Sequence, residues 1–251
     1  MKKLLAFDLD DTLAVTKSPI SDRMATVLGR ILENYDICII SGGKYELFQR
    51  QVISRLDVDE AKLKRLHLMP ACGTQYYLYD TTIGNWQLQY AEDLTEQEIN
   101  TIRVVLEDSV RELGYWPQNP AGEVIEDRSS QVTFSGLGQE AAAEAKYVWD
   151  PDGEKRQQIR ALALEKLPEL EVRLGGTTSL DVTRKGVDKA YGMQKLIEAT
   201  GLSKADILFF GDKLQEGGND YPVKAFGIES IEVVNWEDTA TRLEAILAEH
   251  K

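Results

Sequence analysis

Cysteine, basic charge and long apolar runs are all scarce in this sequence, and each shortage excludes a class of protein. The 251 residues contain 2 cysteines, too few for the disulfide framework of a small secreted domain. With 29 basic against 42 acidic residues the formal net charge is −13, which disfavours nucleic acid or an anionic membrane surface as the main partner. No apolar run approaches the roughly 20 residues of a membrane span, and the opening MKKLLAFDLDD meets acidic residues before a signal-like apolar region could form. We therefore expect a cytoplasmic protein with no nucleic-acid or membrane partner.

Short apolar runs alternate with amphipathic helical patterns at both ends of the chain. Hydrophobic residues make up 43% of the sequence, enough to bury a full core in one domain with a large insertion or in two domains. Apolar strands that alternate with helices are typical of a parallel sheet covered by helices. The predicted strands are residues 4–9, 37–40, 207–210 and 231–234. One helix is predicted to begin near Ser21, and another to follow Asp188 and stop at Gly201.

The middle of the chain has a different pattern. Aromatic and β-branched runs such as YYLYD, NWQLQY and SSQVTF indicate antiparallel strands, and GGTT predicts a hairpin between LEVRL and TSLDV. A capping box, Thr95 with Glu98, predicts the start of a helix that ends at Gly114. We therefore expect an α/β core with a parallel sheet, into which an α+β cap is inserted. The predicted boundaries are residues 1–77 and 184–251 for the core and 78–183 for the cap.

The segment AFDLDDTL places two carboxylates, Asp8 and Asp10, where an apolar strand is predicted to end. Because side chains alternate along a strand, the pair projects to the same side, at the carboxyl edge where open α/β sheets bind ligands. One carboxylate can attack phosphorus while the other handles the proton of the hydroxyl. A carboxylate approaches a phosphate dianion only with a cation present, and Mg²⁺ suits a few carboxylates with water and phosphate. Taken alone, the segment also fits an ordinary acidic strand-to-loop turn.

Two further segments could hold a phosphoryl group. YDICIISGGK runs from an apolar strand into Ser41, Gly42 and Gly43, where backbone N–H groups can converge on an anion. An ordinary strand-to-helix turn is the alternative. In RKGVDKAYG, Lys189 lies at a predicted helix start, where its ammonium and the helix N-terminus can face phosphoryl oxygens. Lys185 is a rival for this role, and a lysine at a helix start is usually only solvated surface.

The fourth segment, ILFFGDKLQEGGNDY, is a predicted strand that ends at Asp212 and enters a glycine-rich acidic loop. The loop carries Glu216, Asn219 and Asp220, whose oxygens could complete a Mg²⁺ site begun at the first strand. An acidic turn is the alternative for this segment too. Because the four segments lie in order at the ends of predicted parallel strands or their adjoining helices, coincidence explains them poorly.

These segments resemble the four motifs of the haloacid dehalogenase (HAD) superfamily. The matching residues are Asp8, Asp10 and Thr12 in the first motif, Ser41 in the second, Lys189 in the third, and Asp212 with Asp220 in the fourth. FFGDK followed by GGND is similar to the eukaryotic-type phosphomannomutases of the type IIB branch, and IEDR and SLDV resemble the cap of that family. The resemblance implies a Rossmann-like core with an inserted substrate-specificity cap, Mg²⁺ as cofactor, and a sugar phosphate as substrate.

The resemblance also implies a role for each matching residue. Asp8 would be the phosphorylated nucleophile and Asp10 the acid/base. The phosphoryl group would be held by Thr12, Ser41, Gly42 and Lys189, with Lys17 at a phosphate-binding position. The Mg²⁺ site would comprise Asp8, the backbone carbonyl of Asp10, and Asp212, with Asp220 and Asn219 beside it. The distal phosphate and the sugar hydroxyls would contact Arg128, Lys146, Ser179 and Asp181.

The sequence departs from the phosphomannomutase pattern at four positions. Asp11 stands where glycine is usual, Lys17 and Lys146 replace arginines, and Gln139 replaces a second cap arginine. Arginine offers phosphate a bidentate fork, whereas lysine offers a point charge and glutamine offers none. We therefore expect a weaker or rearranged grip on the distal phosphate.

Three functions remain open at this level. A mutase that converts mannose 6-phosphate to mannose 1-phosphate must hold a bisphosphate in two orientations and keep water off the phosphoaspartate. A sugar-phosphate phosphatase of the same branch needs only the first site and a water, and the departures in the cap favour it. The segments DVTRKGVDK and GGND lead us to favour the mutase. A non-catalytic sugar-phosphate-binding protein is disfavoured by the intact Asp8, Asp10, Lys189 and Asp212. Whether the chain forms a homodimer through its cap, as relatives do, stays open.

Overall fold

A computed structural model describes residues 2–249 and divides the chain into two compact units. Unit 1 comprises residues 1–91 and 188–251, and unit 2 comprises residues 92–187. Unit 1 is thus assembled from both ends of the chain, and unit 2 is a single continuous insertion.

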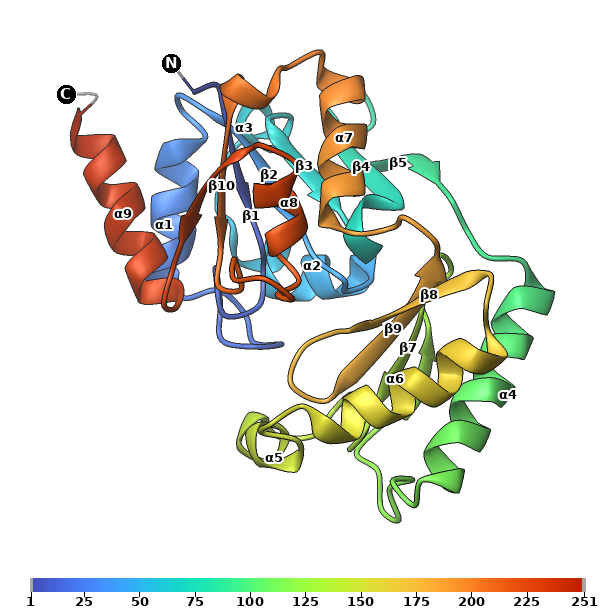
Figure 1. Cartoon of the computed structure of the whole chain (residues 1–251). Helices are drawn as coiled ribbons and strands as arrows, with labels where there is room; N and C mark the ends of the chain where they lie inside the picture. The colour runs from blue at the N-terminus through green and yellow to red at the C-terminus, as the bar shows by residue number, and fades with distance from the viewer. Residues whose placement is uncertain (1, 250–251) are drawn as a thin grey trace. The chain divides into compact units, whose positions relative to one another are not determined.

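Unit 1 is built on a seven-stranded sheet (Figure 1). In sheet order its strands are β11 (Glu229–Glu232), β10 (Ile207–Gly211), β1 (Leu4–Phe7), β2 (Asp36–Ile40), β3 (Leu66–Met69), β4 (Gln75–Asp80) and β5 (Asn85–Ala91). The first five run parallel to one another, and β4 and β5 are antiparallel. All carboxyl ends of the parallel strands therefore lie at one edge of the sheet.

Helices cover both faces of this sheet, as the alternation of side chains along β1 requires. Leu5 and Phe7 contribute to a core shared with α1 and α9, and Leu4 and Ala6 to a second core shared with α7 and α8. The helices of unit 1 are α1 (Asp22–Ile31), α2 (Tyr45–Gln51), α3 (Glu60–Leu63), α7 (Lys189–Thr200), α8 (Tyr221–Ala225) and α9 (Trp236–Glu249). Short 3-10 turns occupy Ile53–Arg55, Ala71–Gly73 and Lys204–Asp206. The mixed α/β fold with a mostly parallel central sheet is as predicted.

Capping residues fix the helices that the sequence predicts. The Ser21 hydroxyl accepts a hydrogen bond from the Met24 N–H at the start of α1, and the Asp188 carboxylate caps α7. Helix α7 ends at Gly201, whose φ of 69° lies in the left-handed region that glycine adopts without strain. These predicted helix ends are confirmed.

Unit 2 pairs a four-stranded antiparallel sheet with helices on one side. The strands, in sheet order, are β6 (Ile125–Asp127), β7 (Val132–Ser135), β9 (Ser179–Arg184) and β8 (Leu170–Leu174), and the helices are α4 (Glu96–Glu112), α5 (Ala143–Trp149) and α6 (Glu154–Lys166). Apolar residues of one sheet face, such as Phe134 and Leu180, pack against α4 and α6. The capping box of Thr95 and Glu98 is present, and β8 and β9 form the predicted hairpin.

One part of the predicted division is wrong. The runs YYLYD and NWQLQY, assigned to the insertion, form β4 and β5 and extend the sheet of unit 1. The unit boundaries therefore fall after residues 91 and 187 instead of after 77 and 183. An antiparallel hairpin added to the edge of a parallel sheet has the same aromatic and β-branched alternation as the strands of the insertion, so periodicity cannot assign it to either unit.

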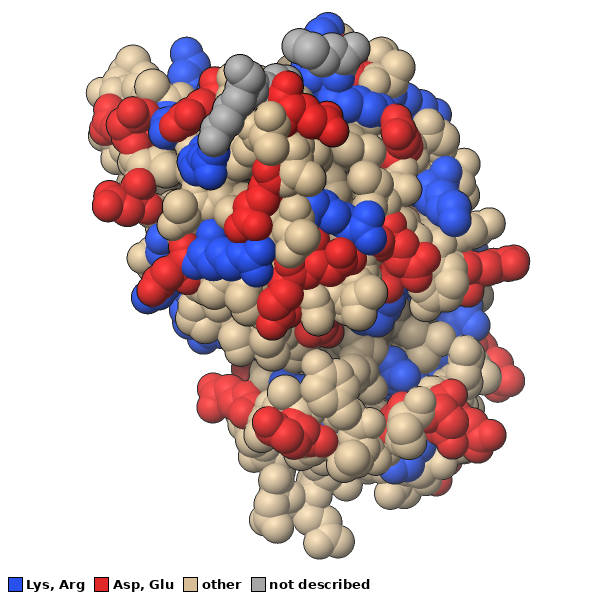
Figure 2. Space-filling view, turned by 90° about the vertical axis from the view of Figure 1, so that its left-hand side faces the viewer, with Lys and Arg blue, Asp and Glu red and all other residues tan. Residues whose placement is uncertain are grey.

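The surface carries charges of both signs. On the face shown in Figure 2, acidic and basic side chains of the described residues are interspersed, without one extended basic area. Along residues 2–249, no helix has both the length and the apolar character needed to cross a membrane.

His67 on β3 is a buried titratable group within the sheet of unit 1. Its Nδ1 lies 2.7 Å from the hydroxyl of Tyr76 on β4, and its side chain is almost completely enclosed. Burial lowers the pKa of His67 to about 4, although Asp36 acts in the opposite direction. The neutral imidazole is therefore the form that the fold accommodates.

This burial predicts a component of acid sensitivity. The unfolded chain, with an imidazole pKa near 6.5, binds a proton that the folded chain rejects down to about pH 4. Stability should therefore fall as the pH falls through that window, by an amount on the order of 3 kcal/mol for this group. The double variant His67→Leu/Tyr76→Phe removes the imidazole and the hydroxyl that pairs with it. Its free energy of unfolding in urea should therefore lack the pH-dependent loss, and should approach that of the wild type as the pH drops. Parallel pH curves for the two proteins would contradict the assignment.

Candidate functional site

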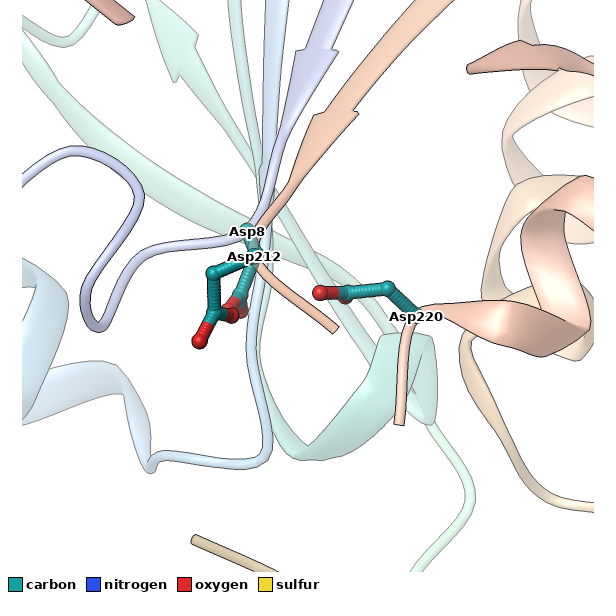
Figure 3. Close-up of side chains that lie close together, drawn as sticks. All are labelled: Asp8, Asp212 and Asp220. Carbon is teal, nitrogen blue, oxygen red and sulfur yellow. The ribbon is translucent and has the colours of Figure 1, made fainter. Parts of the chain in front are cut away.

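Two neighbouring parallel strands are each followed directly by an aspartate. Asp8 follows β1 and Asp212 follows β10, and these strands pair in the register that places Phe7 opposite Phe210. The Asp8 N–H donates to the Phe210 carbonyl 3.0 Å away, which continues the ladder to the end of the strand. Both carboxylates consequently lie at the carboxyl edge of the sheet, as Figure 3 shows.

Asp220, at the start of α8, points its carboxylate toward the same place (Figure 3). It is fully buried, and its Oδ2 accepts a hydrogen bond of 3.1 Å from the Lys213 N–H. A Cβ on Gly211 would lie 2.6 Å from Cγ of Asp220, so only glycine at this position leaves room for the carboxylate. One oxygen from each of Asp8, Asp212 and Asp220 lies within 4.8 Å of the others.

The Lys189 ammonium lies between two of these three carboxylates. Its Nζ is 2.6 Å from Oδ1 of Asp8 and 2.5 Å from Oδ1 of Asp220, and the side chain is 2% exposed. Burial lowers the pKa of Lys189, but Asp220 and Asp8 more than offset that effect and hold the pKa above its ordinary value. The rival Lys185 is exposed, so the geometry selects Lys189 as the buried cation.

Three carboxylates share this place with two lysines, Lys189 and Lys213. Burial raises the pKa of Asp8 to about 8 against the opposing effect of Lys189, and burial also raises the pKa of Asp212. Lys213 lies 3.2 Å from Asp212, yet Oδ1 of Asp212 is buried without a hydrogen-bond partner among the described residues. Three clustered carboxylates with an unpaired oxygen are a donor set that suits a hard divalent cation.

The Asp10 carboxylate lies outside this group of three. Its Oδ1 accepts hydrogen bonds from the Lys17 N–H at 2.7 Å and from Nε2 of Gln51 at 3.3 Å. Asp11, at the position where glycine is usual, has a φ of 62°, a left-handed conformation that aspartate tolerates better than most residues.

Hydroxyl and amide groups also lie in the segments that follow β1, β2 and β10. The Thr12 hydroxyl is fully buried and has no hydrogen-bond partner in the described chain, and the same holds for the buried amide oxygen of Asn219. Ser41 follows β2, and its Oγ accepts a bond of 3.2 Å from the Gly43 N–H. Each of these groups retains capacity to bind a ligand. Of the predicted core residues, the structure thus brings Asp8, Lys189, Asp212 and Asp220 into one cluster, and Ser41 follows the strand next to β1.

The predicted residues of unit 2 lie mostly on one face of its sheet. Ser179 and Asp181 share a face of β9, where Oγ of Ser179 accepts from the Gly176 N–H and Asp181 accepts from the Thr133 hydroxyl at 2.8 Å. Arg128, just after β6, forms an ion pair of 2.8 Å with Glu126. Lys146 lies on α5 instead, and its ammonium donates to the backbone carbonyl of Gln139 at 2.9 Å. The face opposite the helices is therefore polar and charged.

Three polar residues near these groups were missed by the sequence analysis. Lys213 stands directly after Asp212, so the string FFGDK could have pointed to it. Arg173 lies opposite Asp181 in the hairpin register, which could have been counted from GGTT. Gln51 approaches Asp10 from 41 positions away on α2, and no local pattern marks it.

The buried ion pairs make a prediction about stability. Replacing Lys189 with Met should destabilise the protein by about 3–5 kcal/mol, because two buried carboxylates lose their counter-charge. Lys185→Met, the same chemical change on an exposed side chain, should shift the free energy of unfolding by no more than about 0.5 kcal/mol. Urea unfolding at neutral pH in the presence of a chelator measures both. Equal effects of the two substitutions would refute the electrostatic description of the site.

The family profile and the curated relatives that match this chain point to the same family. The profile of the family described as eukaryotic phosphomannomutase matches residues 24–249. The phosphomannomutase of Saccharomyces cerevisiae is 27% identical over 232 residues, covering 88% of this chain and 84% of the yeast protein. The phosphomannomutase of Babesia bovis is 25% identical over 259 residues and covers 99% of both chains, including the segment with Asp8 and Asp10.

Solved structures share the fold at lower identity. The IMP-nucleotidase of Plasmodium falciparum superimposes with a TM-score of 0.72 at 18% identity, covering 98% of this chain and 67% of that longer chain. At this identity the likeness shows the fold alone. The profile match over most of the sequence and the curated relatives place the protein among the HAD phosphotransferases and phosphatases, and the chain belongs to the eukaryotic phosphomannomutase family.

Proposed function

We propose that this protein is a Mg²⁺-dependent phosphotransferase that carries a phosphoryl group on Asp8 and interconverts mannose 6-phosphate and mannose 1-phosphate. The observation that supports this most strongly is the buried group of Asp8, Asp212 and Asp220 with Lys189 between two of its members. A purely structural role would not require three clustered carboxylates, because buried charges are costly without full compensation.

The reaction uses the chain's own groups as follows. An oxygen of Asp8 forms a bond to phosphorus while the bond from phosphorus to the sugar oxygen breaks. Asp10 donates a proton to the departing sugar oxygen, and takes a proton from the attacking hydroxyl in the reverse direction. Lys189 opposes the negative charge of the phosphoryl oxygens, and the hydroxyls of Thr12 and Ser41 donate to them. The unpaired state of the buried Thr12 hydroxyl supports that assignment.

The donor set fits Mg²⁺. Asp8 and Asp212 would hold the ion through carboxylate oxygens, and Oδ1 of Asp212 is the buried oxygen that lacks another partner in the described residues. Asp220 is committed through Oδ1 to Lys189 and through Oδ2 to the Lys213 N–H, so it would orient the site from beside the ion. When bound, the ion would neutralise charge that develops on the phosphoryl group.

The polar sheet face of unit 2 is the proposed site for the sugar and its second phosphate. Register places Thr133, Asp181 and Arg173 in one row across three strands, with Glu126 as the outer neighbour of Thr133. Carboxylate and hydroxyl groups suit sugar hydroxyls, and the nearby Arg128 offers a cation for phosphate. Association of two chains through unit 2 stays a prediction.

A phosphatase of the same branch is the second candidate, and one observation favours it. The Lys146 ammonium donates to the backbone carbonyl of Gln139 and the side chain is 4% exposed, so the cation that replaces a cap arginine is engaged within unit 2. A weaker hold on the second phosphate would let an intermediate bisphosphate leave and water enter.

Phosphorus NMR distinguishes the two reactions. The protein is mixed with mannose 1-phosphate, Mg²⁺ and a catalytic amount of glucose 1,6-bisphosphate. We expect the mannose 6-phosphate signal to appear, because the enzyme returns the phosphoryl group to the other hydroxyl of the sugar. Inorganic phosphate alone would establish the phosphatase instead.

Asp8→Asn is the matched control for both reactions. It keeps the shape of the side chain and removes the anionic nucleophile, so turnover should fall to the uncatalysed background while the unfolding transition is retained. Turnover at the wild-type rate in this variant would refute the proposed function.

A further inference from the structure

Gln51, the last residue of α2, is a fully buried amide that contacts the proposed acid/base. Its Nε2 lies 3.3 Å from Oδ1 of Asp10 and 2.8 Å from the carbonyl oxygen of Ser18. Its backbone carbonyl also accepts a hydrogen bond of 2.9 Å from the Ile20 N–H. Gln51 therefore holds the segment after Asp10 through its main chain and its side chain together.

The contacts of Gln51 fix which end of its amide faces Asp10. Nε2 has two hydrogens, and a carboxylate and a carbonyl oxygen provide one acceptor for each. A rotated amide would set Oε1 against those two acceptors and leave two repulsive contacts. Oε1 instead points to a buried position where no described residue donates to it. Burying an amide oxygen without a donor is unfavourable. The orientation in which Nε2 contacts Asp10 is therefore present although it leaves Oε1 unpaired.

The donors to Asp10 select one of its two oxygens. Both hydrogen bonds, from the Lys17 N–H and from Gln51, fall on Oδ1. Among the described residues, Oδ2 receives no such bond and is left for proton exchange. We infer that Gln51 is a positioning residue, which holds the Asp10 carboxylate so that Oδ2 faces the sugar oxygen during phosphoryl transfer; this rests on the proposed function of Asp10.

A merely structural role for Gln51 makes a different prediction. If the amide only anchored the loop through Ser18 and Ile20, its loss would disturb every reaction at Asp8 alike. If it positions Asp10, its loss should affect reactions in proportion to their need for a proton. A departing sugar alkoxide is strongly basic and requires the proton, whereas p-nitrophenolate is a stable anion that leaves without one.

Single-turnover release of the leaving group, with enzyme in excess, isolates the transfer to Asp8. The full chain with Mg²⁺ is mixed with mannose 1-phosphate or with p-nitrophenyl phosphate. In Gln51→Met we expect mannose release to slow by about 10-fold to 100-fold, the range that misplacement of a catalytic group produces. Release of p-nitrophenolate should stay within about threefold of the wild type. The ratio of the two rates does not depend on how much of the sample is folded.

Matched variants complete the test. Gln49→Met makes the same change on the exposed part of α2 and should alter neither rate. Gln51→Asn keeps the amide but withdraws it from Asp10, and should reproduce the selective loss if the Met variant folds poorly. Equal slowing of both substrates, or of neither, in the Gln51 variants would overturn the inference.

Two reference variants separate this inference from the proposed function. Asp10→Asn should show the same selective loss as Gln51→Met, with a larger size. If Asp8→Asn still released either leaving group at the wild-type rate, the proposed function would fail. If Asp10→Asn slowed mannose release selectively and Gln51→Met did not, the positioning role of Gln51 would be refuted and the proposed function would stand.

Discussion

The ion pairs of Lys189 with Asp8 and Asp220 are the interaction on which the rest of the candidate site depends. They connect the first strand of the chain with two segments near its end, through a side chain that is almost completely buried. Bringing three carboxylates within 4.8 Å is unfavourable in a low-dielectric interior unless cations accompany them. The buried ammonium supplies part of that compensation, and the three clustered carboxylates form a donor set that suits a divalent cation.

The sheet explains why these residues meet. Parallel strands place their carboxyl ends at one edge, so β1 and β10 deliver Asp8 and Asp212 side by side although 204 positions separate them in the chain. Gly211 is required by the close approach of Asp220, and without it the third carboxylate could not occupy its position. The insertion of unit 2 between residues 91 and 188 leaves this edge of unit 1 intact, because both segments that carry the acids belong to unit 1.

Sequence alone could predict the parts of this arrangement that depend on local pattern. The parallel strands, the helix caps at Ser21 and Asp188, and the grouping of Asp8 with Asp212 follow from periodicity and position, although β1 ends at Phe7, two residues before its predicted end. The hairpin of β4 and β5 was misassigned because its alternation is the same in either unit. Gln51 was missed because a glutamine on a helix gives no sign of a contact across 41 positions. What the sequence could not supply was therefore tertiary: which sheet an edge hairpin joins, and which distant amide reaches a carboxylate.

The structure shows what surrounds three of the residues that depart from the family pattern, Asp11, Gln139 and Lys146. Asp11 occupies a left-handed position, which explains why glycine is usual there and why aspartate is an acceptable replacement. Lys146 donates to the backbone carbonyl of Gln139 in unit 2, a contact that does not depend on the glutamine side chain.

The central claim is that Asp8 carries the phosphoryl group, and mapping of the phosphorylated residue tests it most directly. The protein is mixed with glucose 1,6-bisphosphate and Mg²⁺, quenched in acid within one turnover, digested, and analysed by mass spectrometry. The account predicts one phosphoryl group on the peptide that contains Asp8, and none in Asp8→Asn. A phosphoryl group on any other side chain would contradict it.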